Sequence, residues 1–149
     1  MNPDFIEMLS ALHDAEADYL VVGAHALAAH GRPRATGDLD LWVRPTPANA
    51  DRVYAALTRF GAPLHELAPG DLATPDLVFQ IGVVPVRIDI LTSVSGVTFD
   101  EGWASRMTVP IGTLDVPVIG RECLIRNKRA SGRPRDWADI ADLEGGRRE

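Results

Sequence analysis

Hydrophobic residues recur along much of the chain at the three- and four-residue intervals of a helix that is buried on one side. Asn2-Pro3 supplies a capping residue and a first-turn proline, and an apolar helical face follows as far as about residue 15. Thr46-Pro47 begins another helix in the same way, and Gly61 ends it. Shorter helices are expected over residues 24–30, 121–130 and 136–143.

Strands are indicated by short apolar runs that glycine or polar residues interrupt. Gly82 stands between two such runs, which predicts a hairpin that turns at this glycine. A smaller hairpin is expected around Gly112-Thr113, whereas residues 32–37 and 62–76 are typical of loops. The predicted strands cover residues 19–22, 38–43, 77–81, 83–91, 108–111 and 116–119.

This mixture of helices and antiparallel strand pairs predicts an α/β (α+β) fold, in which helices pack on a mixed β-sheet. The chain has 149 residues, of which 46% are hydrophobic, so one domain over residues 1–149 can bury a core. Since no linker or repeat interrupts the sequence, we expect a central part at about 19–120 and a helical tail at about 121–145.

Composition restricts the compartment and the partners. Cys123 has no second cysteine for an internal disulfide, which favours a reducing, cytoplasmic compartment. No apolar run is long enough to span a bilayer, so no membrane partner is expected. A net charge of −6 argues against a broad nucleic-acid-binding surface. Eight basic residues lie from Arg121 onward, which indicates either a local anion site or a solvated helix surface.

Asp38 and Asp40 begin one predicted strand, and residues two apart on a strand point to the same face. Leu39 and Leu41 alternate with them toward the core, so the acids are expected on the open face. Neighbouring carboxylates repel each other unless a cation lies between them, and oxygen ligands suit Mg²⁺ or Mn²⁺. The pair is therefore either a metal site or an exposed acidic pair on a strand.

A third acid, Asp89, lies within an apolar strand, where a carboxylate needs a partner. One candidate is Arg87, two residues earlier on the same face. The other is a metal shared with Asp38 and Asp40, because carboxylates from two adjacent strands can hold two metals for phosphoryl transfer. Nearby, a strand that runs into Gly23 and then a helix lets a phosphate approach the backbone, although such turns are also common without a ligand.

These features occur together in a known signature. The DNA-polymerase-β-like nucleotidyltransferase superfamily has a motif that resembles Gly23-Ala24 followed by Thr36-Gly37-Asp38-Leu39-Asp40. Its small bacterial members, among them the abortive-infection type-E toxin nucleotidyltransferases, have a pattern similar to Arg34-x-Thr36-x-Asp38-x-Asp40. Their tail element resembles Leu124-Ile125-x-x-Lys128 with Arg133-Pro134-Arg135-Asp136-x-x-Asp139-Ile140.

The resemblance implies a nucleotidyltransferase fold and the transfer of a nucleoside monophosphate from ATP, GTP, CTP or UTP to a hydroxyl group of RNA, a protein or a small molecule. It implies metal ligation by Asp38, Asp40 and Asp89, with Asp89 also helping to deprotonate the acceptor. Nucleotide contacts are implied for Gly23, Ala24, Arg34, Thr36 and Lys128. Support of the tail or of Lys128 is implied for Arg135, Asp136 and Asp139.

The same resemblance suggests tRNA as a target and an antitoxin or a second copy of the chain as a partner. One departure is Ala24, because the superfamily usually has serine there, and the loss of its hydrogen bond costs about 0.5–1.5 kcal/mol. Ala24 favours an alternative, a nucleotide-sensing or partner-binding module without catalysis. A metal-dependent nuclease is a third hypothesis, although it has no use for a triphosphate-binding turn.

Overall fold

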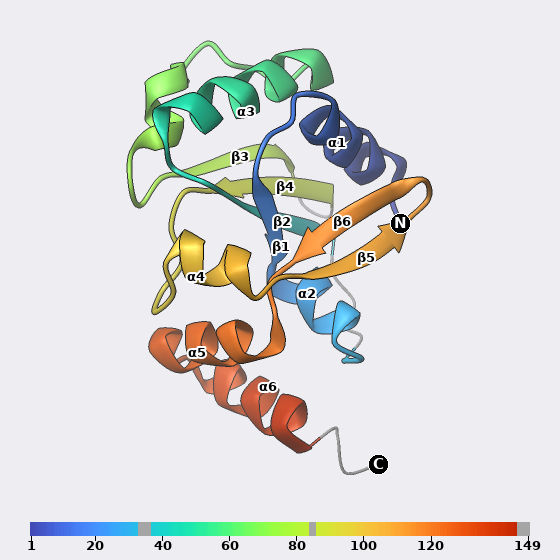
Figure 1. The fold of residues 1–149 in the computed structure, drawn as a ribbon, viewed down its shortest axis with the longest axis vertical. Helices are drawn as coiled ribbons and strands as arrows, with labels where there is room; N and C mark the ends of the chain where they lie inside the picture. Colours follow the sequence, from blue (N-terminus) through green and yellow to red (C-terminus); the bar gives the residue numbers. More distant parts are fainter. Residues whose placement is uncertain (33–36, 84–85, 146–149) are drawn as a thin grey trace.

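A six-stranded mixed β-sheet forms the centre of the molecule in a computed structural model, which describes residues 1–32, 37–83 and 86–145 (Figure 1). The strands are β1 (Tyr19–Val22), β2 (Asp38–Val43), β3 (Val78–Val83), β4 (Val86–Leu91), β5 (Met107–Ile111) and β6 (Leu114–Val118). The helices are α1 (Pro3–Asp14), α2 (Gly23–Ala29), α3 (Pro47–Phe60), α4 (Phe99–Ala104), α5 (Arg121–Ser131) and α6 (Pro134–Gly145), with a 3₁₀ helix η1 (Pro69–Ala73).

The order of the strands in the sheet is β3-β4-β2-β1-β6-β5. β2 runs parallel to β4 and antiparallel to β1, while β1 runs parallel to β6. The outer pairs, β3 with β4 and β5 with β6, are antiparallel hairpins. The predicted mixed sheet with helices packed on it is therefore confirmed, and the two predicted hairpins form its edges.

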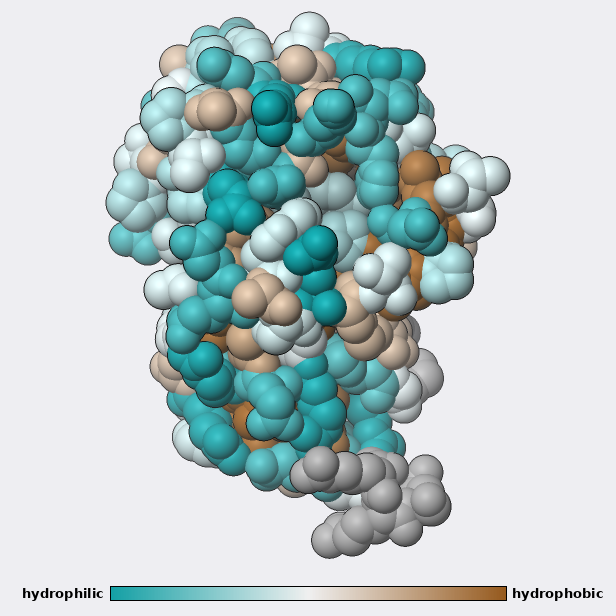
Figure 2. Space-filling model, in the orientation of Figure 1, coloured by the Kyte–Doolittle hydropathy of each residue, from teal (hydrophilic) through white to brown (hydrophobic). Residues whose placement is uncertain are grey.

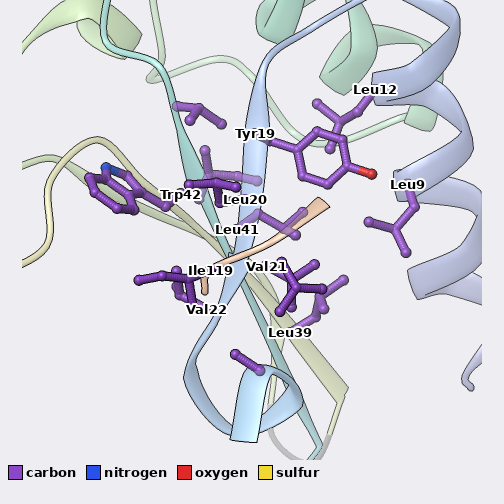
Figure 3. Close-up of a cluster of buried hydrophobic side chains, with 14 of the residues drawn as sticks. Leu9, Leu12, Tyr19, Leu20, Val21, Val22, Leu39, Leu41, Trp42 and Ile119 are labelled. Carbon is purple, nitrogen blue, oxygen red and sulfur yellow. The ribbon is translucent and has the colours of Figure 1, made fainter. Parts of the chain in front are cut away.

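Side chains of the central strands alternate between two buried faces. Tyr19 points toward Leu9 and Leu12 of α1, whereas Trp42 lies on the opposite side of the sheet (Figure 3). On the second face, α4 approaches closely, because a Cβ atom at Gly102 would lie 3.0 Å from side-chain atoms of both Leu20 and Trp42. The face that carries Asp38 and Asp40 is thus covered by α4 at Trp42, whereas the two acids line a pocket.

The helix ends form at the predicted signals. The Asn2 side chain accepts a hydrogen bond from the Asp4 amide, and the Thr46 side chain accepts one from the Asn49 amide. Gly61 ends α3 in the left-handed conformation that favours glycine, with a φ of 92°. Local capping chemistry was therefore sufficient to place both of these helices.

The prediction that the hairpin turns at Gly82 is wrong, because both strands continue beyond this residue. Gly82 lies inside β3, opposite Arg87, and the two strands continue to the pair formed by Val83 and Val86. Glycine is needed there because φ is 84° and a Cβ atom would lie 2.8 Å from the Val86 carbonyl oxygen. The residue marks a close backbone approach within the hairpin rather than its turn.

Two short helices were not predicted. η1 lies within the segment that was expected to be a loop, and α4 lies in a stretch without a prediction. α4 nevertheless carries a start signal in its sequence, since Thr98 and Glu101 form a reciprocal capping box. The Thr98 amide donates to Glu101 Oε1 over 2.9 Å, and the Glu101 amide donates to Thr98 Oγ1 over 3.2 Å.

The C-terminal helices α5 and α6 are separated at Gly132, as predicted, and they pack against each other in a hairpin. The loop after β4 packs on α5, where a Cβ atom at Gly96 would lie 2.6 Å from the Ala130 Cβ. Asn127 Nδ2 also donates to the Ser95 carbonyl oxygen over 2.9 Å. Buried residues of α1, α5 and α6 contribute to the same hydrophobic core as those of the sheet.

Hydrophilic residues cover most of the face seen in Figure 2, and hydrophobic ones gather at its right edge over the β5–β6 hairpin. Within the part of the chain that the structure describes, no helix is long and apolar enough to cross a membrane.

The buried position of Leu41 leads to a test of this architecture. Leu41 in β2 is 0% exposed, so Leu41→Ala should lower the free energy of unfolding by about 2–5 kcal/mol, as measured by urea denaturation. Val78 in the edge strand β3 is 56% exposed, and Val78→Ala should cost less than about 1 kcal/mol. Equal losses for the two variants would contradict the assignment of the core.

Candidate active site

Four charged side chains lie in two opposing pairs on one face of the sheet, where β2 and β4 pair in parallel. This carboxylate grid consists of Asp38, Asp40, Arg87 and Asp89. Asp38 lies directly opposite Arg87, and Asp40 lies directly opposite Asp89. Leu39, on the other face of β2, is fully buried in the core. The register therefore fixes three carboxylates and one guanidinium as immediate neighbours, so the predicted convergence of the three aspartates is observed.

Arg87 joins two of these carboxylates. Its Nε donates to Asp89 Oδ1 over 2.9 Å, and its Nη2 donates to Asp89 Oδ2 over 3.2 Å. The same Nη2 donates to Asp38 Oδ2 over 3.0 Å. These contacts raise the pKa of Arg87, with the hydrogen bond to Asp89 as the largest cause. Arg87, one of the two partners considered for Asp89, thus contacts both of its carboxylate oxygens.

The negative charge of Asp40 is the one that Arg87 offsets least, because the hydrogen bonds of Arg87 go to Asp89 and Asp38. Burial, followed by the negative charges of Asp89 and Asp38 and a hydrogen bond with Asp89, raises the pKa of Asp40 to about 6. The charge of Arg87 acts in the opposite direction but does not cancel these effects. Without a further cation, Asp40 therefore holds its proton up to about pH 6.

Gly23 lies directly against Asp40. A Cβ atom at position 23 would lie 2.1 Å from Asp40 Oδ2, so any side chain there would displace the carboxylate. The φ angle of Gly23 is 71°, which also favours glycine. α2 begins at this residue, and the side chain of the preceding Val22 does not cap its first turn. The sequence predicted that glycine lets a phosphate approach, and the structure adds that it makes room for Asp40.

A pocket of about 430 Å³ opens beside the grid. One part of its wall is apolar, and the rest combines carboxylates with basic side chains from α5, α6 and β4. The lining residues are Val22, Gly23, Ala24, Leu27, Asp38, Asp40, Arg87, Asp89, Leu91, Val94, Asn127, Lys128, Arg133 and Arg135. Such a concave site with convergent polar groups is typical of ligand binding.

Lys128 is buried on the α5 side of the pocket, with 7% of its surface exposed. Its Nζ donates to Asp139 Oδ2 over 2.9 Å and lies 3.7 Å from Asp136 Oδ1. Asp139 and Asp136 thus lie where the predicted support of Lys128 requires them. The charge of Lys128 is already shared with two carboxylates, so it is not an isolated cation.

Asp136 is fully buried and is held mainly by Arg133. The side chain and the backbone amide of Arg133 both donate to it, over 2.8 Å from Nε and 3.0 Å from the amide. Burial acts to raise the pKa of Asp136, but the hydrogen bonds from Arg133 and the charges of Arg133 and Lys128 outweigh it and lower the pKa. Asp136 therefore stays ionised and fixes the start of α6.

Arg135 differs from the other basic residues of the pocket. Arg87, Lys128 and Arg133 each contact a carboxylate, whereas Arg135 is exposed and has no hydrogen bond or ion pair with any residue that the structure describes. The predicted role of Arg135 in supporting the tail therefore has no polar contact behind it. Its guanidinium is available to an anion in the pocket.

The remaining predicted site residues divide into two groups. Gly23 and Ala24 line the pocket as expected. Arg34 and Thr36 lie outside the described residues. Sequence reasoning missed Leu91, Val94 and Asn127 as lining residues. Val94 and Asn127 come together only because the loop after β4 docks on α5. Leu91 did carry a signal, because it shares a strand face with Asp89.

The donor set fits Mg²⁺ or Mn²⁺. Asp38, Asp40 and Asp89 present carboxylate oxygens to one pocket, and such hard ligands suit these ions. Burial, together with the charges of Asp89 and Asp38, raises the pKa of Asp40 despite the nearby guanidinium of Arg87. Among the described residues, no three acidic, histidine or cysteine side chains are already arranged as a metal site, and the contacts of Arg87 with Asp89 and Asp38 agree with this.

Neither a protein-family model nor a curated protein matches this sequence. Solved structures do match its fold. A candidate nucleotidyltransferase from Thermotoga maritima, TM1012, superposes with a TM-score of 0.57 at 13% identity, over 99% of this chain and 93% of that one.

The lincosamide antibiotic adenylyltransferase LnuA, whose structure contains lincomycin, superposes with a TM-score of 0.59 at 13% identity, over 97% of this chain and 96% of that one. The sheet with its helices, including the strands that carry the aspartates, thus has the fold of these nucleotidyltransferase structures.

Proposed function

We propose that this protein is a metal-dependent nucleotidyltransferase that transfers a nucleoside monophosphate from a nucleoside triphosphate to a hydroxyl group. The observation that carries the proposal is the register of β2 and β4, which makes Asp38, Asp40 and Asp89 neighbours in one pocket. The fold shared with an adenylyltransferase supports it. Three neighbouring carboxylates repel one another, and a bound divalent cation would relieve the part of this repulsion that the single guanidinium of Arg87 leaves.

In the proposed reaction, the acceptor oxygen forms a bond to the α-phosphorus while the bond from that phosphorus to the pyrophosphate oxygen breaks. The hydroxyl proton passes to Asp89, the aspartate that the resemblance assigns to this step. Asp38, Asp40 and Asp89 would hold Mg²⁺ or Mn²⁺, which would stabilise the charge that develops on the phosphate oxygens. Arg135 and Lys128 line the same pocket and would contact the triphosphate.

A small molecule is the acceptor class that we favour. LnuA binds lincomycin and aligns with this chain over almost the full length of both, so a protein of this size accommodates a small acceptor without a further domain. RNA, including tRNA, or a protein side chain would give the same release of pyrophosphate. These two classes, the toxin-like role and an antitoxin partner rest on the sequence resemblance.

A non-catalytic nucleotide-sensing module is the second candidate, and one specific observation favours it. Ala24 lines the pocket where the superfamily usually has a serine hydroxyl. Such a module would bind a nucleoside triphosphate without releasing pyrophosphate, so a pyrophosphate assay separates the two candidates. A nuclease would instead degrade labelled nucleic acid without any triphosphate.

Nucleotide binding is the first test of this proposal. With Mg²⁺ or Mn²⁺, at least one of ATP, GTP, CTP and UTP should raise the melting temperature, because a ligand that binds only the native state at 100 times its Kd adds about 2.7 kcal/mol of stability. Asp40→Asn should abolish this rise. Asp142→Asn changes an exposed acid of α6 outside the pocket and should retain it. No rise for the wild-type protein at millimolar nucleotide would contradict the proposal.

The stability of metal-free protein should depend on Asp40 in a defined pH range. Because the fold raises the pKa of Asp40 from 3.8 to about 6, it favours the protonated form, and this stabilisation is present below pH 4 and lost as pH rises through 6. In EDTA, the free energy of unfolding of Asp40→Asn, relative to that of wild type, should therefore increase by about 1–2 kcal/mol from pH 4.5 to pH 7.5. This magnitude is reduced to allow for the partial exposure of the carboxylate. Urea denaturation at both pH values measures it, and a pH-independent difference would contradict the assigned pKa.

The free guanidinium of Arg135 gives a third test. Arg135→Gln should weaken nucleotide binding about tenfold through the loss of a charge-assisted hydrogen bond, with the fold unchanged. Arg129 is the matched control, because it is a half-exposed arginine of α5 that pairs with Glu144 and does not line the pocket. Isothermal titration of both variants with the preferred nucleotide measures the effect. Equal affinities for Arg135→Gln and Arg129→Gln would remove Arg135 from the binding site.

A further inference from the structure

Arg87 occupies a defined place within the carboxylate grid. It lies on the same strand face as Asp89, two residues earlier, and its Cα lies directly opposite that of Asp38. Its guanidinium reaches both acids with donor–acceptor distances between 2.9 and 3.2 Å. Both positions follow from the register of β2 with β4, so the contacts are built into the sheet.

These hydrogen bonds use the oxygen atoms that a metal would need. Both oxygens of Asp89 accept from Arg87, and Asp89 also shares a hydrogen bond with Asp40. One oxygen of Asp38 accepts from Arg87 as well. A carboxylate offers about four lone-pair positions, so a cation that bridges Asp89 to its neighbours competes with the guanidinium for them.

We propose that Arg87 is a built-in counter-ion of the metal-free site, which a divalent cation displaces from Asp89 and Asp38 when it binds. This inference rests on the proposed function. Arg87 then has two effects with opposite consequences. It relieves repulsion among the carboxylates when no metal is bound, and it raises the metal concentration that is needed to load the site. It is a positioning residue for the carboxylates rather than a group that touches the reacting atoms.

The surroundings of Arg87 permit this exchange. Its side chain faces the pocket of about 430 Å³ and is 26% exposed, so the guanidinium has space to leave the aspartates. No aromatic ring among the described residues stacks on it. The pocket also receives anionic phosphate groups in the proposed reaction, which would give the released guanidinium a new partner.

Arg44 shows what a fixed arginine bridge looks like in the same protein. It joins Asp18 and Asp100 through hydrogen bonds of 2.8 and 2.6 Å, which resembles the contacts of Arg87. Its guanidinium carbon also lies 4.7 Å from the centre of the Phe99 ring, and Arg44 does not line the pocket. Arg44→Gln therefore removes an equivalent bridge without touching the grid and serves as the matched control.

The test is a titration of nucleotide-free protein with Mn²⁺ at pH 8, in which electron paramagnetic resonance measures the free ion. Arg87→Gln should bind Mn²⁺ roughly tenfold or more tightly than wild type, because the competing charge-assisted hydrogen bonds are lost. Arg87→Lys keeps the charge but loses the two-pronged contact, so its affinity should lie between the two. Arg44→Gln should bind Mn²⁺ as wild type does.

A second readout follows the metal-free state. In EDTA, Arg87→Gln should have a lower melting temperature than wild type, and saturating Mn²⁺ should remove most of that difference. If Arg87→Gln does not fold without metal, the Mn²⁺ affinity of Arg87→Lys alone decides, and an increase over wild type supports the exchange.

Two outcomes would overturn the inference, and they can be told apart. If wild type binds Mn²⁺ and both Arg87 variants bind it equally or more weakly, Arg87 orients the ligands instead of competing with the metal, and the proposed function stands. If neither wild type nor the Arg87 variants bind Mn²⁺ at millimolar concentration, the exchange and the proposed metal-dependent function are both wrong.

Discussion

The parallel pairing of β2 with β4 brings three ionisable carboxylates against one another, and the surrounding structure has to compensate for their repulsion. Arg87 neutralises part of the charge, while burial and the charges of Asp89 and Asp38 raise the pKa of Asp40 to about 6. The opposite face of the same strands is tightly buried, with Leu39 and Leu41 fully enclosed. Burial of this hydrophobic face holds the register, and the register holds the acids together.

A second cluster of charges faces the first across the pocket. Lys128 of α5 contacts Asp136 and Asp139 of α6, and Arg133, just before α6, holds Asp136. Removal of one partner would leave an uncompensated buried charge, so such a cluster tends to specify one arrangement. The loop that packs on α5 through Gly96 connects this cluster to β4. The pocket thus lies between the sheet and the C-terminal helices, and both contribute charged side chains to its lining.

The structural neighbours show that very different sequences can form this fold. At 13% identity, two chains of similar length keep the sheet and its helices. Packing constraints explain this, because many combinations of apolar residues can fill the same core. Under the proposed function, the choice of acceptor would depend on the pocket wall rather than on the fold. Leu91, Val94 and Asn127 form part of this wall, and they lie beside residues that the fold holds in place.

Local signals in the sequence determined the helix caps at Asn2 and Thr46, the alternation of β2, and the three aspartates as candidates, because each depends on residues a few positions apart. Capping chemistry at Thr98 also marked α4, although periodicity alone did not. Tertiary structure alone decided the rest, since these features join segments far apart in the chain. They are the opposition of Asp40 to Asp89, the contact of Asp40 with Gly23, the bridge from Arg87 to Asp38, and the absence of a polar partner for Arg135 among the described residues.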